Sequence, residues 1–240
     1  IDIMLAIDVS TSMLAEDLKP NRLEAAKDVA AEFINGRPND NIGITLFAGE
    51  TFTQCPLTVD HAVLLDMIHN IKCGLITDGT AVGMGIANAV TRLKDSKAKS
   101  KVIILLTDGT NNKGDISPMT AAEIAKSFGI RVYTIGVGTN GMAPYPYPVG
   151  NTVQYVSMPV EIDEKTLTEI AGTTDGNYFR ATSNSKLKEV YEEIDKLEKT
   201  KLNVKEYSKR DEEYHWFALA AFLCVLLEVL LRNSVLKKIP

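Results

Sequence analysis

Apolar residues in this chain occur in two alternating patterns. Short continuous runs of strand length alternate with longer segments in which apolar residues recur every three or four positions, as on one face of a helix. The runs predict strands at residues 3–7, 42–47, 51–54, 102–107, 131–137 and 178–180. The helical segments are residues 23–36, 59–71, 81–93, 117–129, 163–171 and 187–197.

Strands that are apolar throughout and are separated by helices are typical of a parallel sheet buried on both faces. Runs 42–47 and 51–54 lie close together and predict a hairpin that adds one antiparallel edge strand. The predicted fold is therefore α/β, a doubly wound, mostly parallel central sheet with helices on both faces. Residues 143–159 break the pattern with several prolines and tyrosines, and we expect a structured surface loop there, neither strand nor helix.

The composition changes after residue 199, where a polar, charged segment leads into an almost wholly apolar run at 216–231. As a helix this run spans about 24 Å, which is short for a bilayer core. Aromatic residues at one end and basic residues at the other extend it to the interfaces. We predict a globular domain at 1–199, a linker at 200–213, a transmembrane helix at 214–236 and a basic cytoplasmic tail at 237–240. The alternative is a helix buried in a larger core.

The composition and the first residues of the sequence indicate which classes of partner and site to expect. The sequence begins inside a strand pattern without an initiator methionine, so we expect a fragment of a longer protein. A formal net charge of −5, with no basic stripe, argues against nucleic acid as a partner. The three cysteines are too few and too irregularly spaced for a disulfide scaffold or a zinc site.

Oxygen-bearing side chains follow the first predicted strand. Asp8, Ser10 and Ser12 lie on a short loop at the carboxyl end of that strand, where open α/β sheets build their sites. Carboxylate and hydroxyl oxygens are hard donors of the kind that Mg²⁺ prefers. This motif alone leaves two interpretations open: a metal site, or a capped turn in which the side chains bond nearby backbone N–H groups.

Two further segments favour the metal site. Asp108 follows the strongest strand run and emerges at the same sheet edge as Asp8. Thr80 ends a hydroxyl-rich turn before a helix whose first residues are small enough for close packing on a neighbouring element. Three loops thus supply two carboxylates and three hydroxyls, a suitable set for Mg²⁺ or Mn²⁺. The predicted metal ligands are Asp8, Ser10, Ser12, Thr80 and Asp108.

These three motifs together resemble the von Willebrand factor type A (VWA) domain family, over residues 1 to about 197. The resemblance implies a metal-ion-dependent adhesion site (MIDAS). Ser10 and Ser12 would bind the metal directly, Thr80 directly or through water, and Asp8 and Asp108 largely through water. It further implies that the open metal position accepts a carboxylate from a partner protein, which is adhesion and not catalysis.

The sequence is also similar to the Bat membrane proteins of bacteria, named for an aerotolerance operon, and among them to the type called BatA. This resemblance rests on segments 53–57, 143–163 and 178–182 and on the apolar tail ending at residues 237–240. That resemblance implies an inner-membrane anchor with the globular domain on the periplasmic side. It also implies assembly with other Bat proteins and a MoxR-class AAA ATPase, in a role linked to stress or oxygen tolerance.

Enzymatic alternatives are weaker. Asp8 could be the nucleophile of a Mg²⁺-dependent phosphohydrolase, but Ser10 stands where such enzymes carry a second aspartate, the usual acid/base partner. Residues 136–141 match the dinucleotide pattern G-x-G-x-x-G, but the prolines beyond them are incompatible with the helix that the pattern requires. We therefore expect a binding domain without catalytic residues. A third hypothesis keeps the fold with a vestigial site and docking through segment 143–159.

Overall fold

A computed structural model describes residues 1–149 and 152–207, together with positions 218, 219, 221, 222, 225, 228 and 231. Contacts divide the chain into two compact units, Ile1–Leu197 and Glu198–Pro240. The fold and the candidate site described below belong to the first unit.

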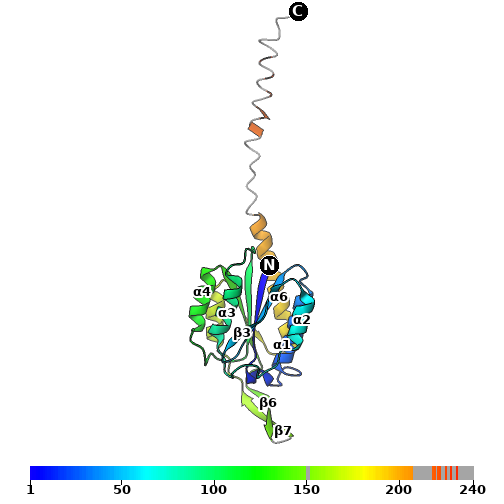
Figure 1. The fold of residues 1–240 in the computed structure, drawn as a ribbon, viewed down its shortest axis with the longest axis vertical. Helices are drawn as coiled ribbons and strands as arrows, with labels where there is room; N and C mark the ends of the chain where they lie inside the picture. Colours follow the sequence, from blue (N-terminus) through cyan, green and yellow to red (C-terminus); the bar gives the residue numbers. More distant parts are fainter. Residues whose placement is uncertain are drawn as a thin grey trace, which may run out of the picture. The chain divides into compact units, whose positions relative to one another are not determined.

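A six-stranded sheet forms the centre of this unit (Figure 1), with strand order β3-β2-β1-β4-β5-β8. Every neighbouring pair is parallel except β2 and β3, which are antiparallel. The sequence therefore predicted correctly a mostly parallel sheet with one antiparallel edge strand. The strands are β1 Asp2–Asp8, β2 Asn41–Phe47, β3 Thr51–Thr58, β4 Lys101–Thr107, β5 Ile130–Val137 and β8 Tyr178–Ala181.

Helices cover both faces of the sheet because residues of each buried strand point alternately to opposite faces. In β1, Ile3, Leu5 and Ile7 pack in one core with α1, α2 and α6, whereas Met4 and Ala6 pack in the other with α3, α4 and α5. Figure 1 shows the two helical layers on either side of the sheet. The helices are η1 Thr11–Leu14, α1 Arg22–Asn35, α2 His61–His69, α3 Val82–Leu93, α4 Pro118–Ser127, α5 Glu164–Thr173 and α6 Asn184–Tyr207.

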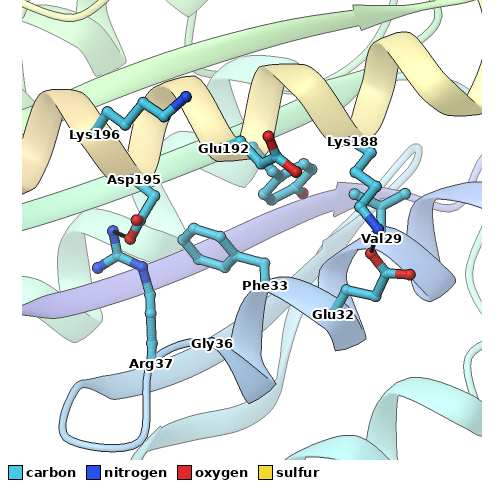
Figure 2. Close-up of a pocket in the computed structure, with 10 residues that line it drawn as sticks. Val29, Glu32, Phe33, Gly36, Arg37, Lys188, Glu192, Asp195 and Lys196 are labelled. Atoms are coloured by element: carbon cyan, nitrogen blue, oxygen red, sulfur yellow. Dashed lines mark ion pairs between the residues drawn. The ribbon is translucent and has the colours of Figure 1, made fainter.

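Helix α6 packs along α1 through aromatic and charged contacts (Figure 2). The Phe33 and Tyr191 rings lie 5.1 Å apart between centroids, and the Arg37 guanidinium lies 4.7 Å above the Phe33 ring. Arg37 also pairs with Asp195 at 2.7 Å. A hollow of about 360 Å³ remains between the helices, and none of the predicted metal ligands lines it. This hollow is therefore separate from the candidate site.

Two strands, at residues 142–149 and 152–159, pair as a β-hairpin, so the prediction of a loop without strands at 143–159 was wrong. Strand β6, Met142–Val149, pairs antiparallel with β7, Thr152–Pro159. Pro144, Pro146 and Pro148 occupy alternate positions of β6. Alternate residues of an edge strand direct their backbone groups away from the partner strand, so prolines there remove no hydrogen bond from the ladder. Prolines are thus compatible with this strand, which the sequence interpretation overlooked.

The predicted transmembrane helix at 214–236 lies largely outside the described residues. Among the helical residues that are described, no helix is both long enough and apolar enough to span a bilayer.

Candidate functional site

The sheet topology brings Asp8 and Asp108 to one edge. Strands β1 and β4 are parallel neighbours, with Ile7 opposite Leu106, so the residues that follow them emerge side by side. The chain leaves β1 toward β2 on one side, while β4 lies on the other side. Such a reversal of strand order opens a crevice at the carboxyl ends of the strands. The candidate site lies at this switch point.

A chain of hydrogen bonds joins the β1–η1 loop to Asp108. The Ser10 backbone N–H donates to Asp8 Oδ1 at 2.9 Å, and Ser12 Oγ donates to Asp108 Oδ1 at 2.7 Å. Ser10 Oγ and Ser12 Oγ lie 2.9 Å apart. Because the Ser12 hydroxyl proton is already directed to Asp108, Ser10 is the donor in this pair. The lone pairs of Ser10 Oγ are therefore not used by Ser12 and can face a cation.

Thr80 reaches the same place from the turn before α3. Its backbone N–H donates to Asn112 Oδ1 at 2.9 Å, and the Asn112 N–H donates back to the Thr80 carbonyl at 2.9 Å. A Cβ placed on Gly109 would lie 3.4 Å from Thr80 Oγ1, so the hydroxyl lies beside the backbone that follows Asp108. The structure thus brings all five predicted ligands to one sheet edge.

The two carboxylates are buried next to each other. Asp8 is 0% exposed and Asp108 is 2% exposed. Burial, and then the charge of Asp108, raises the pKa of Asp8 to about 7, although hydrogen bonds from Ser10 and Thr107 oppose the rise. Burial also raises the pKa of Asp108, against the opposing charge of Arg22. Two buried acids of this kind favour a neighbouring cation.

Arg22 supplies one such cation and was not predicted from the sequence. Its Nη1 donates to Asp108 Oδ2 at 2.7 Å, while Nε and Nη2 donate to the two oxygens of Asp17, each at 2.7 Å. Asp17 also accepts from the Thr139 backbone N–H at 2.8 Å. Since Arg22 is 86 residues from Asp108, no local pattern could have identified this ion pair.

Asp78 and Thr107 complete the surroundings of the site. Asp78 accepts from the Thr11 N–H at 3.0 Å and from Thr11 Oγ1 at 2.8 Å, which ties the β1–η1 loop to the turn that carries Thr80. Thr107 Oγ1 donates to Asp8 Oδ2 at 2.6 Å. No role was predicted for either residue from the sequence.

The donor set fits a hard divalent cation. All five candidate ligands offer oxygen, and the carboxylates supply the negative charge that such a cation requires. Among the described residues, no group of three or more His, Cys, Asp and Glu is placed to hold a metal, because three of the five candidates are hydroxyl residues. The five candidate side chains are therefore suited to a hard divalent cation.

Comparison with known families decides the assignment. The sequence matches the family model for the von Willebrand factor type A domain over residues 2–193. The chain belongs to the VWA family. The resemblance drawn from the three motifs is thereby confirmed, over almost the whole of the Ile1–Leu197 unit.

Two solved structures are similar to this VWA domain at 34% sequence identity. One is BatB from Bacteroides thetaiotaomicron, with a TM-score of 0.72 over 83% of this chain and 99% of that chain. The other is an aerotolerance-related membrane protein from Bacteroides fragilis, with a TM-score of 0.70 over 82% of this chain and 99% of that chain. The chain is thus a Bat-like VWA protein, and a closer resemblance of its motifs to the BatA type stays a prediction.

More distant similarities bear on the metal and on the size of the whole protein. Proximal thread matrix protein 1 from the mussel byssus, solved with a zinc-occupied MIDAS motif, has a TM-score of 0.63 and 25% identity over 82% of this chain and 45% of that chain. A UPF0353 protein of Mycolicibacterium paratuberculosis is 32% identical over 203 residues, or 79% of this chain. The chain spans 58% of the length of that relative.

Proposed function

We propose that this VWA domain holds a divalent cation at the sheet edge and, through it, a carboxylate of a partner protein. The observation that carries the proposal is the pair of buried carboxylates, Asp8 and Asp108. The Ser10 backbone N–H bonds Asp8, and the Ser10 and Ser12 hydroxyls continue the hydrogen-bond chain to Asp108. These four residues and Thr80 would hold the ion. When bound, the ion supplies an electrophilic position for an acidic side chain of the partner.

We also propose that the site binds without catalysing a reaction. A phosphoryl-accepting aspartate needs a free oxygen directed at the substrate. Both Asp8 oxygens instead accept hydrogen bonds, Oδ1 from Ser10 N–H and Oδ2 from Thr107 Oγ1, and the side chain is fully buried. Asp108 is tied to Ser12 and Arg22, which leaves it unsuited to act as a general acid.

The membrane location and the partner proteins are also part of the proposal, and they are suggested by the relatives of the chain. We propose a protein anchored in the bacterial inner membrane by residues 214–236, with the VWA domain on the periplasmic side. It would assemble with other Bat proteins and a MoxR-class AAA ATPase, in a process linked to oxygen or stress tolerance. Support comes from the similarity to BatB and to a membrane protein described as aerotolerance-related.

Metal-dependent stabilisation and partner capture test the proposal together. Mg²⁺ or Mn²⁺ should raise the melting temperature, because binding to the folded state alone adds about 2.7 kcal/mol to the free energy of unfolding at a metal concentration 100 times Kd. The double variant Ser10→Ala, Ser12→Ala should lose both the shift and metal-dependent capture of a partner from membranes. Ser127→Ala, an exposed serine on α4, is the matched control and should keep both.

Two outcomes would count against this function. Partner capture by the double variant in a chelator would show that the metal does not bridge the two proteins. Turnover of a generic phosphoester that disappears in Asp8→Asn would favour the phosphohydrolase instead.

A further inference from the structure

The β6–β7 hairpin exposes an unusual surface within the Ile1–Leu197 unit. No residue from Asn140 to Val160 is charged, in a chain with 24% charged residues. All eight residues of β7 are exposed. Seven large apolar side chains of the hairpin are each at least 43% exposed: Met142, Tyr147, Val149, Val153, Tyr155, Val156 and Met158. An exposed apolar surface of this kind marks an interaction site.

The hairpin is held in a defined position beside the loop that follows β1 (Figure 1). The Glu16 backbone N–H donates to the Pro144 carbonyl at 2.8 Å, and Tyr155 Oη donates to Glu16 Oε1 at 3.0 Å. Because the Pro144 carbonyl bonds Glu16, it is directed away from β7. This contact therefore identifies Pro144 as a residue of β6 whose backbone groups face the outer edge of the hairpin.

The two edges differ in their capacity to pair. Pro146 and Pro148 share the orientation of Pro144, so the outer edge of β6 lacks N–H donors at three successive outward positions. The register places Ser157 opposite Pro144 and Tyr155 opposite Pro146. In an antiparallel ladder both members of such a pair face outward, so β7 offers intact N–H and carbonyl groups along its outer edge. The outer edge of β6 therefore cannot pair fully with another strand, whereas the outer edge of β7 can.

We propose that β7 pairs antiparallel with β7 of a second copy of this chain, with the two-fold axis at Tyr155. Tyr155 would then lie opposite Tyr155 of the second copy, and Val153 opposite Ser157. The paired residues would exchange backbone hydrogen bonds, and the facing aromatic rings add a favourable cross-strand contact.

Two features favour a second copy over a different partner strand. Natural edge strands are protected from self-association by charges or prolines, and β7 has neither before its last residue. In the dimer, both outer edges of the four-stranded sheet would be the proline-bearing β6 strands, so assembly would stop at two copies. This inference is independent of the metal site, since it uses none of the metal ligands.

Sedimentation velocity on the full chain in detergent tests the proposal. Over a concentration series into the high micromolar range, the protein should form a species of twice the 26.3 kDa chain mass. The double variant Val153→Pro, Ser157→Pro removes only outward-facing N–H groups, so it should retain the hairpin and become monomeric. Tyr155→Phe keeps the backbone edge, loses only the bond to Glu16, and should remain a dimer.

Oxidative cross-linking tests the register and does not depend on the proline variants folding. Tyr155→Cys should form a disulfide-linked dimer above the wild-type background, because directly opposite Cα atoms lie about 5.5 Å apart. Val153→Cys and Ser157→Cys should cross-link when mixed, but neither should do so alone. A monomer at all concentrations, a dimer that survives the proline variant, or absence of these cross-links overturns the proposal. If the wild-type chain is monomeric and captures a different protein, and the proline double variant loses that capture, the outer edge of β7 binds that protein instead.

Discussion

Removing the Arg22 guanidinium should expose how strongly the candidate site depends on positive charge. Arg22 pairs with Asp17 and Asp108 at 2.7 Å each, and the three side chains are 4%, 3% and 0% exposed. Breaking a buried ion pair by removing one partner costs about 3–5 kcal/mol, because the remaining charge is left unpaired in a low-dielectric interior. We therefore expect Arg22→Met to lower the free energy of unfolding in a chelator by about that amount.

The measurement is urea denaturation of the wild type and the variant, with and without Mg²⁺. A bound cation would restore positive charge beside Asp108, so Mg²⁺ should stabilise Arg22→Met more than it stabilises the wild type. Lys188→Met is the matched control, since Lys188 pairs with Glu32 at the same 2.7 Å but both side chains are more than half exposed. Exposed pairs contribute little. A loss below about 1 kcal/mol for Arg22→Met would refute the reasoning.

Three further predictions test the site and the packing around it. Thr107→Val removes the hydroxyl that donates to buried Asp8 and should cost about 1–3 kcal/mol in chemical denaturation. Thr45→Val removes a buried hydroxyl that has no hydrogen-bond partner among the described residues, so this variant should be neutral or stabilising. Burial alone would raise the pKa of Asp17, but hydrogen bonds from the Arg22 guanidinium lower it below the ordinary value. The ionised Asp17 carboxylate therefore stabilises the fold above the ordinary pKa of about 3.9, and this stabilisation is lost as the pH falls below that value. The melting temperature of Asp17→Asn should depend less on pH than that of the wild type over this acidic range. Gly83→Ala places a Cβ 2.1 Å from the Ile116 carbonyl oxygen. The resulting overpacking should cost about 1–3 kcal/mol of stability and lower the melting temperature.

The central sheet could be predicted because its strands are buried on both faces. Runs such as Ile3–Ile7 or Val102–Leu106 contain no polar residue, and such runs separated by helices fit few folds other than a covered parallel sheet. The first residues of two helices could also be predicted, because a helix start depends on residues close together in the sequence. Ser117 and Asp163 cap α4 and α5 by accepting from the backbone N–H groups of Thr120 and Thr166.

The candidate ligands could be predicted for a related reason. Asp8 is the last residue of buried strand β1 and Asp108 directly follows buried strand β4, so the strand pattern itself places both at the sheet edge. Arg22 could not be found in this way, because the first residue of an amphipathic helix carries no sign of which distant carboxylate it contacts. Its role depends on how α1 crosses the sheet, which is a property of the packing and not of the local sequence.

The hairpin was missed because proline was treated as incompatible with a strand. That rule holds for central strands, where every backbone N–H takes part in the ladder. In β6 the three prolines fall at every second residue, and the strand has a free edge to receive them. The spacing of the prolines, and not their number, was the informative signal.

Titration calorimetry of Mg²⁺ into the full chain tests the central claim most directly. The account predicts saturable binding of one ion per chain to the wild type and to Ser127→Ala, and loss of that binding in the double variant Ser10→Ala, Ser12→Ala with its fold intact by circular dichroism. Unchanged Mg²⁺ affinity in the folded double variant would contradict the account, because it would locate the ion away from the sheet edge that Asp8 and Asp108 form.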